Sequence, residues 1–295
     1  MWELTSTDDD GLGEPTSVKP KWKYSNEDPL IDGKNDIVFF VHGFNNTMQR
    51  AEQVWRRDTY EALNKVVSQA GMARIVLFYW SGCGSTIREL GGLLYPDLVK
   101  NAAKTADHLA RYLADRTQSA LNPIDISFVA HSLGCRVVLE TLQRLESVNT
   151  VRVRRVLLMA GAVAEGYCVP WERFGFQIAK DEERVLWSTK DSALKVPFRL
   201  GQRLAEDQPE SHRRAIGRRG GPSGRWSTAS CTTNAGHGDY WSSTSTVRHI
   251  AEIIEPSPSA PVARSIDRSA VFRDAPDREG LERDVFDRRQ PGRAI

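Results

Sequence analysis

The stretch Asp125-Ile-Ser-Phe-Val-Ala-His-Ser-Leu-Gly-Cys-Arg-Val-Val-Leu139 decides the fold. Its first half continues an apolar run over 124–130, which predicts a strand that is buried on both faces. Its second half opens an amphipathic pattern that extends to about residue 147 and predicts a helix. Only the short turn His131-Ser132-Leu133 separates the two elements. A strand that passes so abruptly into a helix indicates one βα unit of a parallel sheet.

This turn has the composition of a nucleophile elbow, in which a serine stands at the apex of a strained strand-to-helix turn. Small residues are needed two positions before and two positions after the serine, and Ala130 and Gly134 meet that need. Alanine replaces the glycine that is usual at the first position. The start of the following helix would direct N–H groups and positive dipole toward the Ser132 hydroxyl. An ordinary serine N-cap gives a similar motif, but the position between a buried strand and an amphipathic helix favours the elbow.

Further apolar runs alternate with helical patterns on both sides of this unit. The alternation predicts parallel βαβ crossovers and an α/β fold with a mostly parallel, doubly wound sheet flanked by helices. The expected strands are 37–41, 75–80, 124–130, 155–163 and 185–188, and the expected helices are 47–70, 99–113, 133–147 and 245–254.

The two ends of the chain differ in composition from its middle. Residues 1–36 mix an acidic run with glycines and prolines and predict an irregular leader. Residues 256–295 are rich in Pro, Ser, Arg, Asp and Glu, and too poor in large apolar residues to offset the entropy of ordering, so they predict a disordered charged tail. The organisation expected is therefore a leader, a catalytic domain over 37–255 and a tail.

Composition narrows the function classes. The 40 basic and 38 acidic residues give a net charge of +2, without the basic excess of a nucleic-acid-binding protein. The four cysteines are widely separated and show no metal-ligand spacing, so we expect reduced thiols, no metal and no cofactor. No apolar run approaches the ~20 residues of a membrane span. No signal peptide is evident, which predicts a cytoplasmic protein, with signal-independent secretion left open.

A second candidate site segment follows the first strong strand, in Val41-His42-Gly43-Phe44-Asn45-Asn46. The turn after this strand faces the nucleophile in such a sheet and supplies one N–H of an oxyanion hole, while the residue after the serine supplies the other. We therefore expect the backbone N–H groups of Phe44 and Leu133 to form the hole. His42 is expected to orient this loop rather than to act as a base.

A serine nucleophile needs a base, and the base is best oriented by an acid. His237 is the favoured base because it stands in the flexible turn Gly236-His-Gly-Asp-Tyr-Trp241, just before the last helix, with His249 and His212 as alternatives. Asp191 is the favoured acid because it lies in the turn after a late strand and between the serine and the histidine in chain order. Glu165 is its main rival.

The chain resembles the α/β-hydrolase superfamily and, more narrowly, a bacterial group of α/β-hydrolases of unknown function. The resemblance covers about residues 35–255. It rests on Val-His-Gly-Phe-Asn-Asn at 41–46, Phe-Tyr-Trp at 78–80, Ala-His-Ser-Leu-Gly at 130–134, Ser-Thr-Lys-Asp-Ser-Ala-Leu at 188–194 and Gly-His-Gly-Asp-Tyr-Trp at 236–241. It implies a serine hydrolase with the triad Ser132, Asp191 and His237, and it implies no particular substrate.

The expected reaction is hydrolysis of a carboxylic ester on short to medium acyl chains, because an ester needs less leaving-group assistance than an amide. A small-molecule or lipid ester is the expected partner. A phospholipase or lipase, a thioesterase or peptidase, and a non-catalytic binding module on the same fold remain alternatives. The Arg-rich stretch 213–219 is interpreted as a solvated loop, with anionic head-group binding as the alternative.

Overall fold

The computed structural model describes residues 2–6, 15, 17–20, 30, 36–44, 53–59, 63, 74–81, 95–120, 122–170, 172–175, 183–205, 214–226 and 231–255. All of them belong to one compact unit that ends at Pro256. The predicted tail lies outside the described residues, as does most of the helix predicted over 47–70, of which Val54–Thr59 forms a π-helical segment.

A single mixed sheet runs through the described unit, in the strand order β2-β1-β4-β3-β5-β6-β7-β8. Every neighbouring pair is parallel except β1 and β2. The central strands β3, which is wholly apolar, and β5, which is mostly apolar, are almost wholly buried, as expected for strands covered on both faces. The strands are β1 Trp2–Thr5, β2 Lys19–Pro20, β3 Ile37–Val41, β4 Arg74–Tyr79, β5 Ile124–His131, β6 Val151–Met159, β7 Glu183–Trp187 and β8 Cys231–Thr232.

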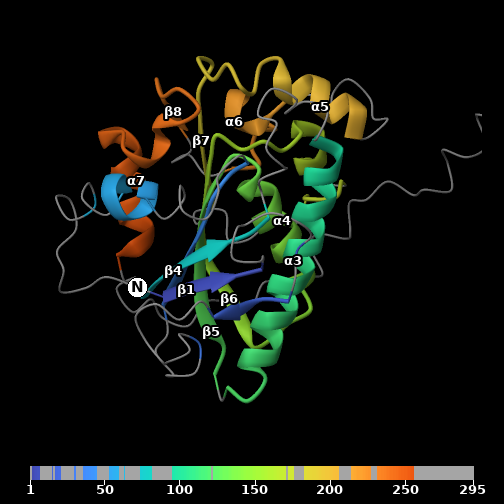
Figure 1. Cartoon of the computed structure of the whole chain (residues 1–295), viewed down its shortest axis with the longest axis vertical. Coiled ribbons are helices and arrows are strands. Elements are labelled where there is room, and N and C mark those ends of the chain that lie inside the picture. Colours follow the sequence, from blue (N-terminus) through green and yellow to red (C-terminus); the bar gives the residue numbers. More distant parts are fainter. Residues whose placement is uncertain are drawn as a thin grey trace, which may run out of the picture. The chain divides into compact units, whose positions relative to one another are not determined.

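Helices cover both faces of this sheet. Helices α3 and α4 pack together on one face, and α7 packs against β5 and β6 on the other (Figure 1). The arrangement confirms the predicted doubly wound α/β fold. The helices are α3 Tyr95–Thr117, α4 Gly134–Leu145, α5 Pro197–Ala205, α6 Ile216–Arg219 and α7 Thr244–Ile254, with 3₁₀ turns at Glu165–Cys168 and Asp239–Trp241.

Three segments differ from the sequence-based expectation. The leader contributes strands at 2–5 and 19–20 instead of being irregular throughout, and β1 pairs with β4. Four residues with alternating polarity carry too weak a pattern to be recognised without that partner strand. Strand β6 begins at Val151, four residues before the expected start, because its first half is a polar, partly exposed run. Residues 216–219 form a helical turn, where a solvated loop was expected.

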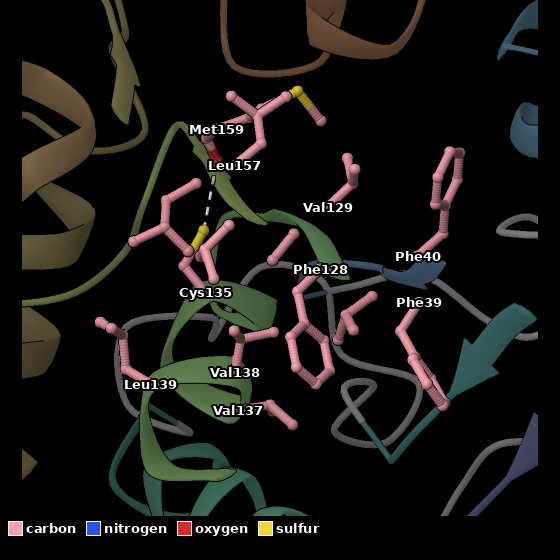
Figure 2. Packing of buried hydrophobic residues seen from close by; sticks show 14 of the residues in the cluster. Phe39, Phe40, Phe128, Val129, Cys135, Val137, Val138, Leu139, Leu157 and Met159 are labelled. Carbon is pink, nitrogen blue, oxygen red and sulfur yellow. Dashed lines mark hydrogen bonds between the residues drawn. The ribbon is translucent and has the colours of Figure 1, made fainter. Parts of the chain in front are cut away.

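The core that supports the strand-to-helix turn lies between β3, β5, β6 and α4 (Figure 2). The rings of Phe39 and Phe128 lie 5.4 Å apart on neighbouring strands. Side chains of α4, among them Val138 and Cys135, pack against this sheet surface. Of the four cysteines, Cys135 and Cys168 have described side chains; both are buried free thiols, and burial raises the pKa of Cys168 to about 12. These thiols therefore act as small apolar core residues.

Candidate active site

Ser132 sits at the junction between β5 and α4 with a positive backbone angle, φ +54°. A non-glycine residue in this region is strained by roughly 1–3 kcal/mol, and the surrounding structure must hold it there. Two backbone hydrogen bonds do so, from the Ser132 amide to the Met159 carbonyl (2.9 Å) and from the Ala162 amide to the Ser132 carbonyl (3.0 Å). The predicted strand-to-helix turn thus has the backbone geometry of a nucleophile elbow.

Gly134 and Gly43 allow the close approach of a second loop to this turn. A Cβ added at Gly134 would lie 2.3 Å from the His42 carbonyl oxygen, which no side chain tolerates. A Cβ added at Gly43 would lie 2.6 Å from the Cβ of Ser132. The loop after β3 therefore lies directly against the serine, and both glycines are required by space rather than by backbone angle.

Three residues that are far apart in the sequence meet at the carboxyl ends of the strands. The Nε2 atom of His237 lies 2.9 Å from the Oγ atom of Ser132. Its Nδ1 atom lies 2.7 Å from Oδ2 of Asp191. Asp191 stands in the turn after β7, and His237 stands in the loop between β8 and the 3₁₀ turn at Asp239–Trp241. Asp191 is fully buried, whereas the His237 side chain is 28% exposed and open to a reactant.

The hydrogen-bond roles follow from what each atom can offer. A carboxylate oxygen only accepts, so Nδ1 of His237 carries the proton that is donated to Asp191. Nε2 then holds a lone pair, and the Ser132 hydroxyl donates to it. The other carboxylate oxygen of Asp191, Oδ1, accepts the amide N–H of Leu194 at 3.0 Å. The assembly can withdraw the serine proton without moving any heavy atom.

A comparison with protein families identifies the chain. The family model described as "Alpha/beta hydrolase of unknown function (DUF900)" matches residues 25–222. The chain belongs to this family. The matched region of this α/β hydrolase includes Ser132 and Asp191, and His237 follows it. No curated protein matches the sequence significantly.

Arg218 is a site residue of this α/β hydrolase that the sequence interpretation missed. Its Nη1 atom donates to the carbonyl oxygen of Asp191 at 2.8 Å and to that of Thr189. Helix α6, which carries Arg218, is anchored by Gly217, whose added Cβ would lie 2.1 Å from the carbonyl carbon of Ala160. The interpretation of 213–219 as a solvated loop is therefore wrong for Gly217 and Arg218. The apolar pair Ala215-Ile216, which is buried in the structure, was the feature of the sequence that could have indicated a packed segment here.

His131, next to the serine, holds the loop that carries His237. Its Nε2 atom lies 2.7 Å from the His237 carbonyl oxygen, and because a carbonyl accepts, the ring must donate. The two imidazole centres lie 5.0 Å apart. Burial and the neighbouring His237 lower the pKa of His131 to about 3, so the ring stays neutral at ordinary pH. The same side chain thus connects the turn at Ser132 to the loop that carries His237.

His42 fixes the loop after β3. Its Nδ1 atom donates to the Gly43 carbonyl at 2.9 Å, and its Nε2 atom accepts the Trp80 amide at 3.2 Å. The Trp80 indole N–H returns a bond to the His42 carbonyl at 2.7 Å. Burial lowers the pKa of His42 to about 4. Both ring nitrogens are engaged by backbone groups, which suits an orienting residue rather than a base.

The alternative acid and bases lie elsewhere or outside the described residues. Glu165 begins the 3₁₀ turn after β6, where its amide bonds the Arg214 carbonyl. His249 lies on α7 with its ring 4.0 Å from Glu252. His212 and the two asparagines at 45 and 46 are outside the described residues. Among the residues that are described, Asp191 and His237 are the pair that the fold brings to Ser132.

The described part of the chain shows neither a metal-binding cluster nor a membrane-spanning helix. They contain no group of three or more His, Cys, Asp or Glu side chains placed to hold a metal ion. None of the described helices is both long enough and apolar enough to cross a bilayer.

Proposed function

We propose that this chain is a serine hydrolase that cleaves carboxylic esters, with Ser132 as nucleophile, His237 as general base and Asp191 as the acid that orients the base. The observation that carries the proposal is the unbroken hydrogen-bond chain from Ser132 Oγ through His237 to Asp191, at 2.9 and 2.7 Å. A serine on a strained elbow with a hydrogen-bonded base and a buried acid supports nucleophilic catalysis more than an ordinary N-cap role.

In the first half-reaction, Ser132 Oγ attacks the ester carbonyl carbon while its proton passes to Nε2 of His237. The imidazolium that forms is stabilised by Asp191, which does not itself take the proton. The tetrahedral intermediate collapses, the carbon–alkoxide bond breaks, and His237 returns the proton to the departing alcohol. An acyl-serine ester remains.

In the second half-reaction, water replaces the alcohol. His237 takes a proton from the water as its oxygen attacks the acyl carbonyl, and the proton then returns to Ser132 as the serine oxygen departs. The products are a carboxylic acid and the free enzyme. Water supplies the only additional atoms, so the two half-reactions need no cofactor.

The negative oxygen of each tetrahedral intermediate needs N–H donors. We assign these to the backbone amides of Leu133 and Phe44. Leu133 directly precedes α4, where the first N–H groups of a helix lack intrahelical acceptors. Phe44 belongs to the loop whose Gly43 abuts Ser132. Loss of one such donor in comparable sites costs about 3–4 kcal/mol of transition-state stabilisation.

A fluorophosphonate probe, which phosphonylates an activated serine, tests the nucleophile. We expect labelling of the wild type and of Ser245→Ala, a matched control on an exposed serine of α7, and none of Ser132→Ala. Turnover of p-nitrophenyl esters from acetate to palmitate would then rank the acyl lengths. A folded wild-type protein that resists the probe and hydrolyses none of these esters would overturn the proposal in favour of a binding module.

A further inference from the structure

Helix α5 displays a row of large apolar side chains on the surface. Among the residues that the structure describes, the large apolar side chains that stand out as exposed are Val196, Leu200 and Leu204, at 64%, 51% and 49%. They are spaced four residues apart, so they form one row along the helix. The Leu200 amide donates to the Val196 carbonyl at 3.0 Å, which keeps Val196 in phase with the helix that follows it.

The opposite face of α5 is already used for packing on α3. Phe198 is buried, and its ring lies 5.7 Å from that of Tyr95 in an edge-on arrangement. Gly201 lies so close to Tyr95 that an added Cβ would stand 2.6 Å from the ring. Gln202 is buried on the same side. The helix cannot rotate to bury the exposed row without losing these contacts.

A row of cations runs beside the apolar row. Lys195, Arg199 and Arg203 are all exposed, and each one precedes an apolar member by one residue. Helix α5 contains no acidic residue. A surface that presents apolar side chains edged by positive charge matches the boundary of an anionic lipid bilayer, where acyl chains lie beneath negative head groups.

We propose that α5 docks this protein on anionic membrane surfaces, with Val196, Leu200 and Leu204 inserted at the acyl boundary and the cations at the head groups. The helix follows the Asp191 turn directly: the Phe198 amide bonds the Ala193 carbonyl, and Asp191 itself accepts the Leu194 amide. Docking would therefore bring esters in the membrane close to the turn that carries Asp191, a consequence that rests on the proposed function. The docking proposal itself does not depend on the proposed function.

A second copy of the chain is a poorer match for this face. A two-fold interface brings the same patch of each copy together, so the two cationic rows would lie close to each other and repel. Three side chains also fall well short of the ~1,000 Å² that a stable interface usually buries.

Vesicle flotation tests the docking without catalysis. The protein carries Ser132→Ala, and the vesicles are phosphatidylcholine alone or an equimolar mixture with phosphatidylglycerol. We expect binding to the anionic vesicles that weakens with added salt. The pair Lys195→Gln and Arg203→Gln should reduce it about twenty-fivefold, because each cation near such a surface contributes about a factor of five. The pair Leu200→Gln and Leu204→Gln should reduce it at least about tenfold at any salt concentration.

The matched control is the pair Lys100→Gln and Arg219→Gln, which removes the same charge from exposed positions on α3 and α6. It should lower binding by much less than the α5 cation pair. Equal binding to both vesicle types, or an equal loss in the control, would overturn the proposal. So would a concentration-dependent dimer that the leucine pair abolishes, because a second copy would then cover the row. Thermal unfolding of each variant establishes that it is folded.

The outcomes separate docking from catalysis. Flotation of the Ser132→Ala protein with anionic vesicles supports docking even if the wild type proves inactive. If both proposals are right, the leucine pair should hydrolyse a soluble short-chain ester normally and lose activity on a long-chain ester carried in anionic vesicles.

Discussion

Replacing Asp191 by asparagine should inactivate the enzyme through the tautomer of His237 rather than through the fold. In the wild type, one carboxylate oxygen of Asp191 accepts the Leu194 amide at 3.0 Å and the other accepts Nδ1–H of His237 at 2.7 Å. An asparagine has the same shape but offers one acceptor and one donor group. Its orientation therefore decides the result.

The Leu194 amide determines that orientation. If the new amide turned its NH₂ group toward Leu194, two donors would face each other in a fully buried position, leaving both unsatisfied. The carbonyl oxygen must therefore stay on Leu194, and the NH₂ group must face Nδ1 of His237. That nitrogen becomes an acceptor, the proton moves to Nε2, and Ser132 then meets an N–H group that cannot take its proton.

We expect Asp191→Asn to lower kcat by about 10⁴, equivalent to about 5.5 kcal/mol in the activation barrier, with little change in KM. Steady-state ester hydrolysis measures this loss, and thermal unfolding should show a Tm close to that of the wild type. The control is Asp239→Asn, because Asp239 accepts the Gly236 amide in the same loop as His237 and an asparagine oxygen keeps that bond. A folded Asp191→Asn enzyme that retains kcat within about tenfold would refute the tautomer argument.

Three further predictions concern the residues that hold the proposed triad in place. His42 and His131 have folded-state pKa values of about 4 and about 3, below the unfolded value of 6.5. Below pH 6.5 the unfolded chain therefore binds more protons than the folded protein, and the free energy of unfolding decreases as the pH is lowered. Chemical unfolding should show a loss of about 2 kcal/mol per histidine between pH 7 and pH 5, and equal stability at both pH values would contradict the assignment. Arg218→Met should lower kcat at least about tenfold by releasing the acid loop, whereas Arg219→Met on the adjacent exposed position should not, as steady-state kinetics would show. Gly43→Ala should lower kcat about a hundredfold with a small change in Tm, because its Cβ would lie 2.6 Å from the Cβ of Ser132, the proposed nucleophile, and displace it. An unchanged kcat would contradict this prediction.

The sequence pattern predicted the central fold well, because its strands carry the strongest local signal. Strand β3 is five consecutive apolar residues, and β5 joins an amphipathic helix through a single turn. Such strands are recognisable from composition alone, since both of their faces are buried. Strand β1 was missed because its four residues, Trp-Glu-Leu-Thr, gain their identity as a strand only from pairing with β4. Short strands of this kind are recognised only through a partner that is distant in the sequence.

The three residues of the proposed triad could be predicted from the sequence because the positions that they occupy restrict the residue type. The elbow requires small residues two positions before and after its apex, which pointed to Ser132, and the choice of His237 and Asp191 followed from chain order and from their positions in turns. The structure brings these three residues together at hydrogen-bond distances, while their roles remain a proposal that the kinetic tests address.

The residues that position the proposed triad were harder to predict from the sequence, for a physical reason. His131 bonds the carbonyl of His237, and Arg218 bonds the carbonyls of Asp191 and Thr189. Every residue has a backbone carbonyl, so the acceptor leaves no trace in the sequence, and only the fold shows which carbonyl lies within reach of a given donor. These bonds connect segments separated by 106 and 27 positions and meet on the two loops that must stay aligned for proton transfer. Because a misplacement of about 1 Å can cost a factor of about a hundred in rate, we expect such donors to matter more to kcat than their modest contribution to stability would suggest.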